Sequence, residues 1–215
     1  MFHRLLKRLI LLPIFLLLAT RTTYVLSAID LRMAGSVIPS ACSMAITGEG
    51  IFNFGSISAA NLRAANYNDL QSMRQTLSIS CSAPALVAIG IIDNRSGTAS
   101  SSLVDDESLF GLGRDASGNA IGGYYLATSG HILNGGPAYA SSSSDAGESW
   151  SSENFLKNGA FYMHSWTDSL GSAPLPISTA MVEVIADPVI APLNTLDVTQ
   201  DFMLDGSATI ELIYL

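Results

Sequence analysis

Residues 202–215 read FMLDGSATIELIYL, and their side chains alternate between two kinds. The even-numbered positions, from Phe202 to Tyr214, are apolar except for Gly206, and most of the positions between them are polar. A period of two is typical of a β-strand with one face on a core and one in water. Because this is the most regular strand pattern in the chain, we expect it to close the fold. The partner of its outer edge then becomes the functional question.

Residues 1–28 are predicted to be an export signal. Arg4, Lys7 and Arg8 precede an eleven-residue apolar run over residues 9–19, which is shorter than the roughly 20 residues that a membrane-spanning helix needs. Cleavage after Ala28 is favoured over cleavage after Ala19, and an uncleaved membrane anchor is the alternative reading. Residues 29–215 are then expected to be a single domain without a membrane span.

Charge excludes one class of partner. Removing residues 1–28 takes away four basic residues and no acidic ones, so the formal net charge changes from −8 to −12. A chain this acidic is not expected to bind nucleic acid by electrostatic attraction.

The two cysteines, Cys42 and Cys81, are expected to form a disulfide in an exported chain, with two buried free thiols as the alternative. Neither has a close cysteine or histidine neighbour, so no metal site is predicted there.

Short strand patterns separated by Gly, Ser, Asn and Pro clusters fill the rest of the chain. They predict an all-β antiparallel sandwich or barrel, with strands over residues 29–37, 51–54, 76–81, 86–92, 124–127, 161–166 and 181–185. Residues 61–70 could hold a helical turn. Residues 94–159, rich in Ser and Gly, are expected to form long loops among short strands.

Sequence motifs of known catalytic sites are absent, so no enzyme and no cofactor is predicted. His131 and Asp145 could join a serine in a catalytic triad, but no spacing selects them. Alternation places His164 on the solvent face of its strand. Residues 105–107 are read as a solvated acidic loop, with a calcium site as the alternative.

Aromatic side chains gather in the middle of the chain. Trp166 is expected in the core. The polar neighbours of Tyr139 and Trp150 make these two the candidate ligand-facing aromatics, for a sugar or a protein ligand.

Four sequence features follow one another along the chain. They are GSVIPSAC at residues 35–42, IFNFGSIS at residues 51–58, the spacing of 39 residues between the cysteines, and the closing strand with its penultimate Tyr214. Together they resemble the pilin subunits of the chaperone–usher pathway of Gram-negative bacteria. FGLG at residues 110–113 and IGGYY at residues 121–125 are similar to segments of fimbrial-like proteins.

The resemblance implies an immunoglobulin-like antiparallel β-sandwich that lacks its last strand. A groove between the first and the C-terminal strands would accept a strand from a periplasmic chaperone, and later from a neighbouring pilus subunit, with an outer-membrane usher as third partner. Its implied walls are Val37 on one side and Ala208, Ile210, Leu212 and Tyr214 on the other, and the carboxylate of Leu215 would meet basic chaperone residues.

Function follows from the resemblance as an expectation. The chain would be a structural subunit of a fimbria, exported to the periplasm and then to the cell surface. Cleavage after Ala28 would leave almost no N-terminal donor arm, which suits a tip position in adhesion to a host receptor or a sugar. The alternative is a stand-alone secreted or periplasmic β-sandwich binding module.

Overall fold

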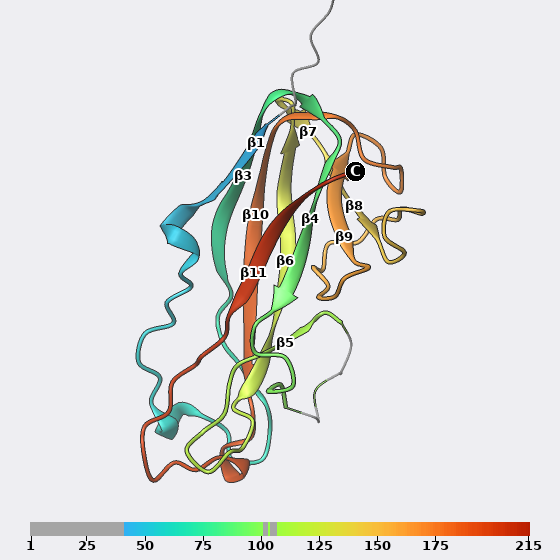
Figure 1. Ribbon diagram of the computed structural model, residues 1–215. Helices are drawn as coiled ribbons and strands as arrows, with labels where there is room; N and C mark the ends of the chain where they lie inside the picture. Colours follow the sequence, from blue (N-terminus) through green and yellow to red (C-terminus); the bar gives the residue numbers. More distant parts are fainter. Residues whose placement is uncertain (1–40, 101–102, 104–106) are drawn as a thin grey trace, which may run out of the picture. The chain divides into compact units, whose positions relative to one another are not determined.

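The computed structural model describes residues 41–100, 103 and 107–215. Its strands form two antiparallel sheets that pack face to face as a sandwich (Figure 1). The all-β antiparallel sandwich is therefore confirmed, and the arrangement is consistent with an immunoglobulin-like fold. Val37 and the strand predicted at residues 29–37 lie outside the described residues, as do Asp105 and Asp106.

The larger sheet has the strand order β1-β3-β10-β6-β5. Its strands are β1 (Cys42–Ile46), β3 (Met73–Ala85), β10 (Ile177–Ile190), β6 (Gly122–Leu133) and β5 (Leu109–Gly111), with β2 (Asn68–Asp69) paired to β10 and β7 (Gly136–Pro137) paired to β6.

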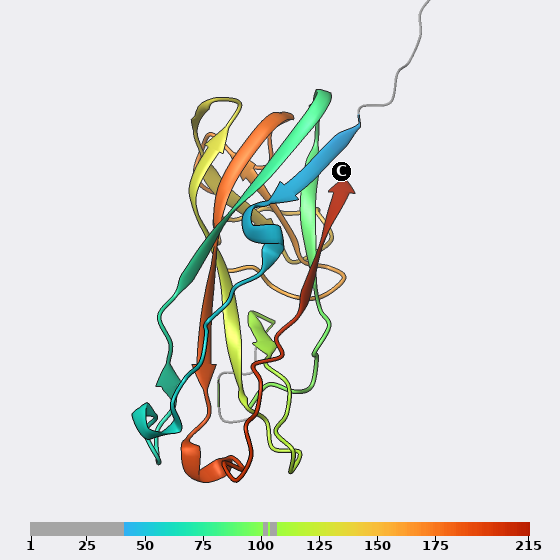
Figure 2. The same cartoon turned by 90° about the vertical axis from the view of Figure 1, so that its left-hand side faces the viewer.

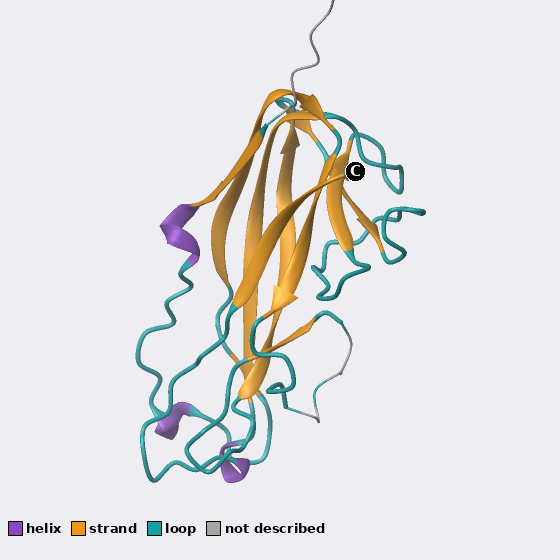
Figure 3. Cartoon of the chain, viewed as in Figure 1, coloured by secondary structure: helices purple, strands orange, loops and turns teal. Residues whose placement is uncertain are grey.

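The smaller sheet has the order β11-β4-β9-β8. Its strands are β11 (Ala208–Tyr214), β4 (Val87–Asp93), β9 (Met163–Thr167) and β8 (Tyr139–Ser143). Three short 3-10 helices, η1 (Thr47–Gly50), η2 (Ala59–Asn61) and η3 (Leu193–Thr195), lie in the connections (Figure 3).

The core lies between the inner faces of the two sheets. Ile79 of β3, Val182 of β10 and Ile89 of β4 are all buried there, and Trp166 of β9 is buried with them, as predicted. Full burial of a side chain of this kind contributes about 1.5–3 kcal/mol. The sandwich therefore has a substantial apolar centre.

The predicted disulfide is confirmed. Cys42 and Cys81 face each other in the β1–β3 register and are joined through their sulfur atoms. In the chain-entropy model a closed loop of this length stabilises the fold by roughly 4 kcal/mol. The bond therefore fastens β1, at the end of the larger sheet's strand order, to its neighbour β3.

One strand predicted from the alternation is absent, and another is shorter than predicted. Residues 51–54 form no strand, because Gly48, Glu49 and Gly50 take left-handed backbone angles that turn the chain away from β3. The closing strand begins at Ala208 and not at residue 202, because its partner β4 ends at Asp93, opposite Ala208. The helical turn predicted within residues 61–70 is wrong: η2 (Ala59–Asn61) ends where that range begins, and β2 lies inside it.

Candidate functional site

The two strands predicted to flank a groove are the edge strands of their sheets. Among the residues that the structure describes, β1 pairs only with β3, and β11 pairs only with β4. No backbone hydrogen bond joins β1 to β11 among the described residues, and Figure 2 shows each with an outer edge that no further strand covers. We call the surface between them the edge groove; its walls are residues 42–57 and 198–214.

The β11 wall follows the alternation seen in the sequence. Ala208, Ile210 and Leu212 point to the core and pack against it, yet each remains only partly buried. Thr209 and Glu211, between them, are exposed to solvent. Every second side chain of β11 is therefore a core residue that is covered incompletely.

The inward-facing apolar side chains of the opposite wall are also only partly buried. Met44 and Ile46 of β1 pack against the core, as do Phe52 and Phe54 in the segment that follows η1, and all four are partly buried. The N–H groups of Phe52 and Phe54 donate to no other residue within the described part of the chain. This wall therefore offers apolar side chains together with unpaired backbone.

Tyr214 closes one end of the edge groove. Its ring is 52% exposed, and its hydroxyl oxygen accepts a hydrogen bond of 2.8 Å from the backbone N–H of Cys42. The N–H of Leu215 donates to the carbonyl oxygen of Leu86 at 3.0 Å. Tyr214 thus joins the two edge strands through its hydroxyl and leaves much of its ring in solvent.

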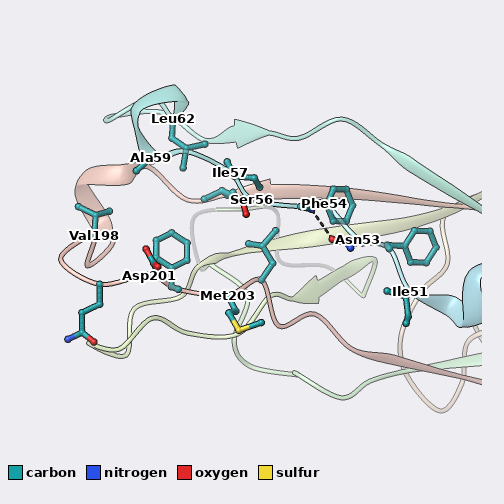
Figure 4. A pocket seen from close by; sticks show the side chains of 16 residues that line it. Ile51, Asn53, Phe54, Ser56, Ile57, Ala59, Leu62, Val198, Asp201 and Met203 are labelled. Carbon is teal, nitrogen blue, oxygen red and sulfur yellow. Dashed lines mark hydrogen bonds between the residues drawn. The ribbon is translucent and has the colours of Figure 1, made fainter.

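The other end of the edge groove opens into a cavity of about 590 Å³. Figure 4 shows the residues that line it, with residues 51–62 on one side and residues 198–204 on the other. The buried Ile190 also lines it, and Phe202 and Leu204 belong to both the cavity wall and the partly buried edge of the core. Apolar surface therefore extends from β11 into the cavity.

The backbone beside the cavity is largely unpaired. The N–H groups of Phe202, Met203 and Leu204 donate to no residue in the part of the chain that the structure describes, and the side chain of Met203 is 82% exposed. On the opposite wall the N–H of Gly55 is satisfied locally by Asn53 Oδ1 at 2.9 Å. A long exposed apolar edge of this kind is a template for pairing with another strand.

Six side chains of the site were missing from the predicted groove set. Phe202 and Leu204 stand in the alternating stretch itself, and continuing that alternation would have found them. The other four side chains also stand at even-numbered positions, like Cys42, but the turn at η1 separates them into two short runs. They are Met44, Ile46, Phe52 and Phe54.

The two candidate ligand-facing aromatics lie on separate elements. Tyr139 begins β8, the edge strand of the smaller sheet, and is 47% exposed. Trp150 is partly buried in the following loop, where its indole N–H donates to the carbonyl oxygen of Gly147 at 3.1 Å.

The prediction that His164 faces solvent is wrong. His164 is only 3% exposed and shares its strand face with the buried Trp166, whereas Phe161 is the exposed residue of that segment. Its Nδ1 lies 2.9 Å from the hydroxyl of Ser142, and its Nε2 accepts the N–H of Lys157 at 2.9 Å. Burial lowers the pKa of His164 to about 4, so the ring is neutral at neutral pH.

The groups that could have formed a catalytic triad are bonded to other partners. His131 Nε2 lies 2.9 Å from the hydroxyl of Thr128, while Asp145 accepts hydrogen bonds from Ser143 and Ser149. These serine hydroxyls hold the pKa of Asp145 down at about 2. Among the described residues no group of three potential metal ligands comes together, and no helix is long and apolar enough to cross a membrane.

Comparison with known proteins gives two matches. A family model described as "Protein of unknown function (DUF1120)" matches residues 31–106, which include β1 to β4. The chain is also similar to Protein GltF of Escherichia coli (strain K12). The two are 28% identical over 230 residues, and the alignment covers 86% of this chain and 88% of that protein.

Proposed function

We propose that this protein is a structural subunit of a bacterial cell-surface fimbria, assembled by insertion of a strand from a partner into the edge groove. The partner is first a periplasmic chaperone and then, after passage through an outer-membrane usher, a neighbouring subunit. The single observation that carries the proposal is the incomplete core between β1 and β11.

The energetics of the groove support this proposal. Two adjacent edge strands of a closed sandwich would normally cover the core between them, but here the inward-facing residues of both walls are only partly buried. An added strand would bury them and bond to free backbone groups. Main-chain hydrogen bonds would supply affinity, and alternate side chains would set the register.

Export is supported by two further observations. The disulfide is typical of chains that fold in an oxidising compartment, and residues 1–28 have the pattern of an export signal. Similarity to a protein of Escherichia coli is in keeping with a bacterial envelope protein.

A stand-alone binding module is the second candidate, favoured by the exposed ring of Tyr139 on the far edge of the smaller sheet. The two functions differ in one property. A subunit with an incomplete core needs a partner strand for stability, whereas a binding module folds without help.

The test is expression of residues 29–215 behind an export signal in an oxidising periplasm, with and without a pilus chaperone from the source bacterium. Recovery only as a one-to-one complex with the chaperone is the expected result. A chain that is soluble alone and unfolds cooperatively with ordinary stability, of about 5–15 kcal/mol, would contradict the proposal and direct attention to ligand screening.

A further inference from the structure

We propose that the strand accepted by the edge groove carries basic side chains on its solvent-facing side, and that it comes from a different protein rather than from a second copy of this chain. This inference rests on the proposed function and adds the chemistry of the partner. It is argued from the charges around the groove.

The walls of the edge groove carry a few acidic residues and no basic ones. Residues 42–57 and 198–215 contain no lysine or arginine. They do contain Glu49, Asp201 and Glu211, which are exposed and form no ion pair among the described residues.

Nearby basic groups already have partners, and one of these partners, Asp205, belongs to the groove wall itself. Arg95 pairs with Asp205 through a contact of 2.8 Å, and Arg74 pairs with Glu183 at 3.1 Å. Arg114 shares a smaller cavity with Asp201, but its guanidinium donates to the carbonyl oxygens of Gly118 and Gly97. The other negative charges of the groove are thus left for a partner to neutralise.

Glu211 is placed to select the charge of that partner. It sits on β11 with its side chain on the solvent side, between the inward-facing Ile210 and Leu212. A strand added to the free edge of β11 would place its own outward side chains beside Glu211. Cβ atoms of directly opposed residues lie about 4.5–5.5 Å apart, close enough for an ion pair with lysine or arginine.

Asp201 would favour basic side chains in the part of the partner strand that enters the cavity. It lines the opening together with Phe202 and Met203, and Glu49 lies on the opposite wall, in η1. A strand that continues from β11 into the cavity would fill the apolar space with one face and pass these carboxylates with the other. An alternation of apolar and basic residues matches both features.

The strand predicted immediately before β1 is not a basic segment of this kind. Residues 29–38, IDLRMAGSVI, precede β1 and alternate in the required way, but they carry one acidic and one basic residue and have no net charge. A second copy would therefore leave the groove charges uncompensated, which is why the proposal commits to a separate, cationic partner.

The test uses three synthetic strand peptides with the same apolar alternation and with lysine, serine or glutamate at every outward position. The denatured, oxidised chain, residues 29–215, is refolded in the presence of each peptide, and binding is measured by fluorescence anisotropy over a series of chain concentrations at low and high salt. The expected order of affinity is lysine, then serine, then glutamate, and the differences should shrink as salt screens the charges.

The outcomes separate this inference from the proposed function. Equal binding of all three peptides, or tightest binding of the glutamate peptide, overturns the charge preference and leaves strand acceptance standing. Failure of all three to bind overturns both.

Matched variants place the effect at Glu211. Glu211→Gln is expected to weaken binding of the lysine peptide about two- to fivefold, the range expected for one cross-strand charge pair, and to leave the serine peptide unaffected. Asp168→Asn removes the same charge from an exposed turn after β9, away from the groove, and is expected to change neither. Equal effects of the two variants would show that net charge alone is responsible.

Discussion

Acid is expected to destabilise this fold through one buried side chain, His164. In the folded chain burial lowers its pKa from 6.5 to about 4. Between these two values the unfolded chain binds a proton that the folded chain does not, so the free energy of unfolding falls as pH falls from about 6.5 to about 4. Above pH 6.5 this residue makes no pH-dependent contribution.

The size of the effect follows from the shift. A difference of one pKa unit is equivalent to 1.36 kcal/mol, so the full shift contributes about 3 kcal/mol. That is a large fraction of the roughly 5–15 kcal/mol typical of a domain. The ring cannot gain a proton without losing the hydrogen bond that its Nε2 accepts from Lys157 N–H.

Urea unfolding at a series of pH values between 7.5 and 4.5 measures this contribution. The serine strand peptide is present at a constant, saturating concentration, so that the edge groove stays filled. The window lies above the range in which Asp115, Asp145 and Asp197 titrate, since hydrogen bonds lower the pKa of each of these carboxyl groups.

His164→Gln removes the titrating group and is expected to flatten the pH dependence across this window. His131→Gln is the matched control. Burial lowers the pKa of His131 too, but this ring is only half-buried, so most of the slope should remain. An identical slope in the wild-type chain and in His164→Gln would refute the reasoning.

Three further substitutions test other parts of the structure. Ile210→Asp places a charge on the inward face of β11 and is expected to abolish recovery of the chaperone complex. Thr209→Asp, on the outward face, should leave recovery of the complex intact. Equal loss of the complex in both variants would argue against a groove. Gly206→Ala is expected to lower the free energy of unfolding by about 1–3 kcal/mol, because its Cβ would lie 2.9 Å from the ring of Tyr124. Gly136→Ala has space for the added methyl group, and its melting temperature in thermal unfolding should be nearly unchanged. Replacing both disulfide cysteines with serine should cost roughly 4 kcal/mol in urea unfolding, and an unchanged midpoint would show that the bond is not needed for stability.

Much of the fold could be predicted from period-two patterns. The strand at residues 76–81 lies inside β3, and the run at residues 86–92 corresponds to β4, because both alternate or stay apolar over most of their length. The disulfide could be expected from the export signal and the even cysteine count. These are local signals, and the sandwich preserves them.

Features that depend on pairing between distant strands could not be predicted from period-two patterns. Residues 51–54 and 202–207 carry strand-like side chains, but within the described part of the chain neither segment pairs with a strand. For His164 the parity of the strand was assigned from Phe161, which turned out to be exposed at 67%. Which face is buried depends on the segment that packs over it, and a single sequence does not contain that information.

The central claim is that the edge groove accepts a strand, and amide hydrogen exchange tests it most directly. In chain freshly refolded without a partner, the N–H groups of β11 that do not bond to β4 are expected to exchange rapidly. The same is expected of residues 52–54 and 202–204, which have no partner in the described structure. In complex with a chaperone or a groove peptide, both sets should become strongly protected while the far edge at β8 stays unchanged. Unchanged exchange along β11 in a stable complex, with protection appearing elsewhere, would contradict the account.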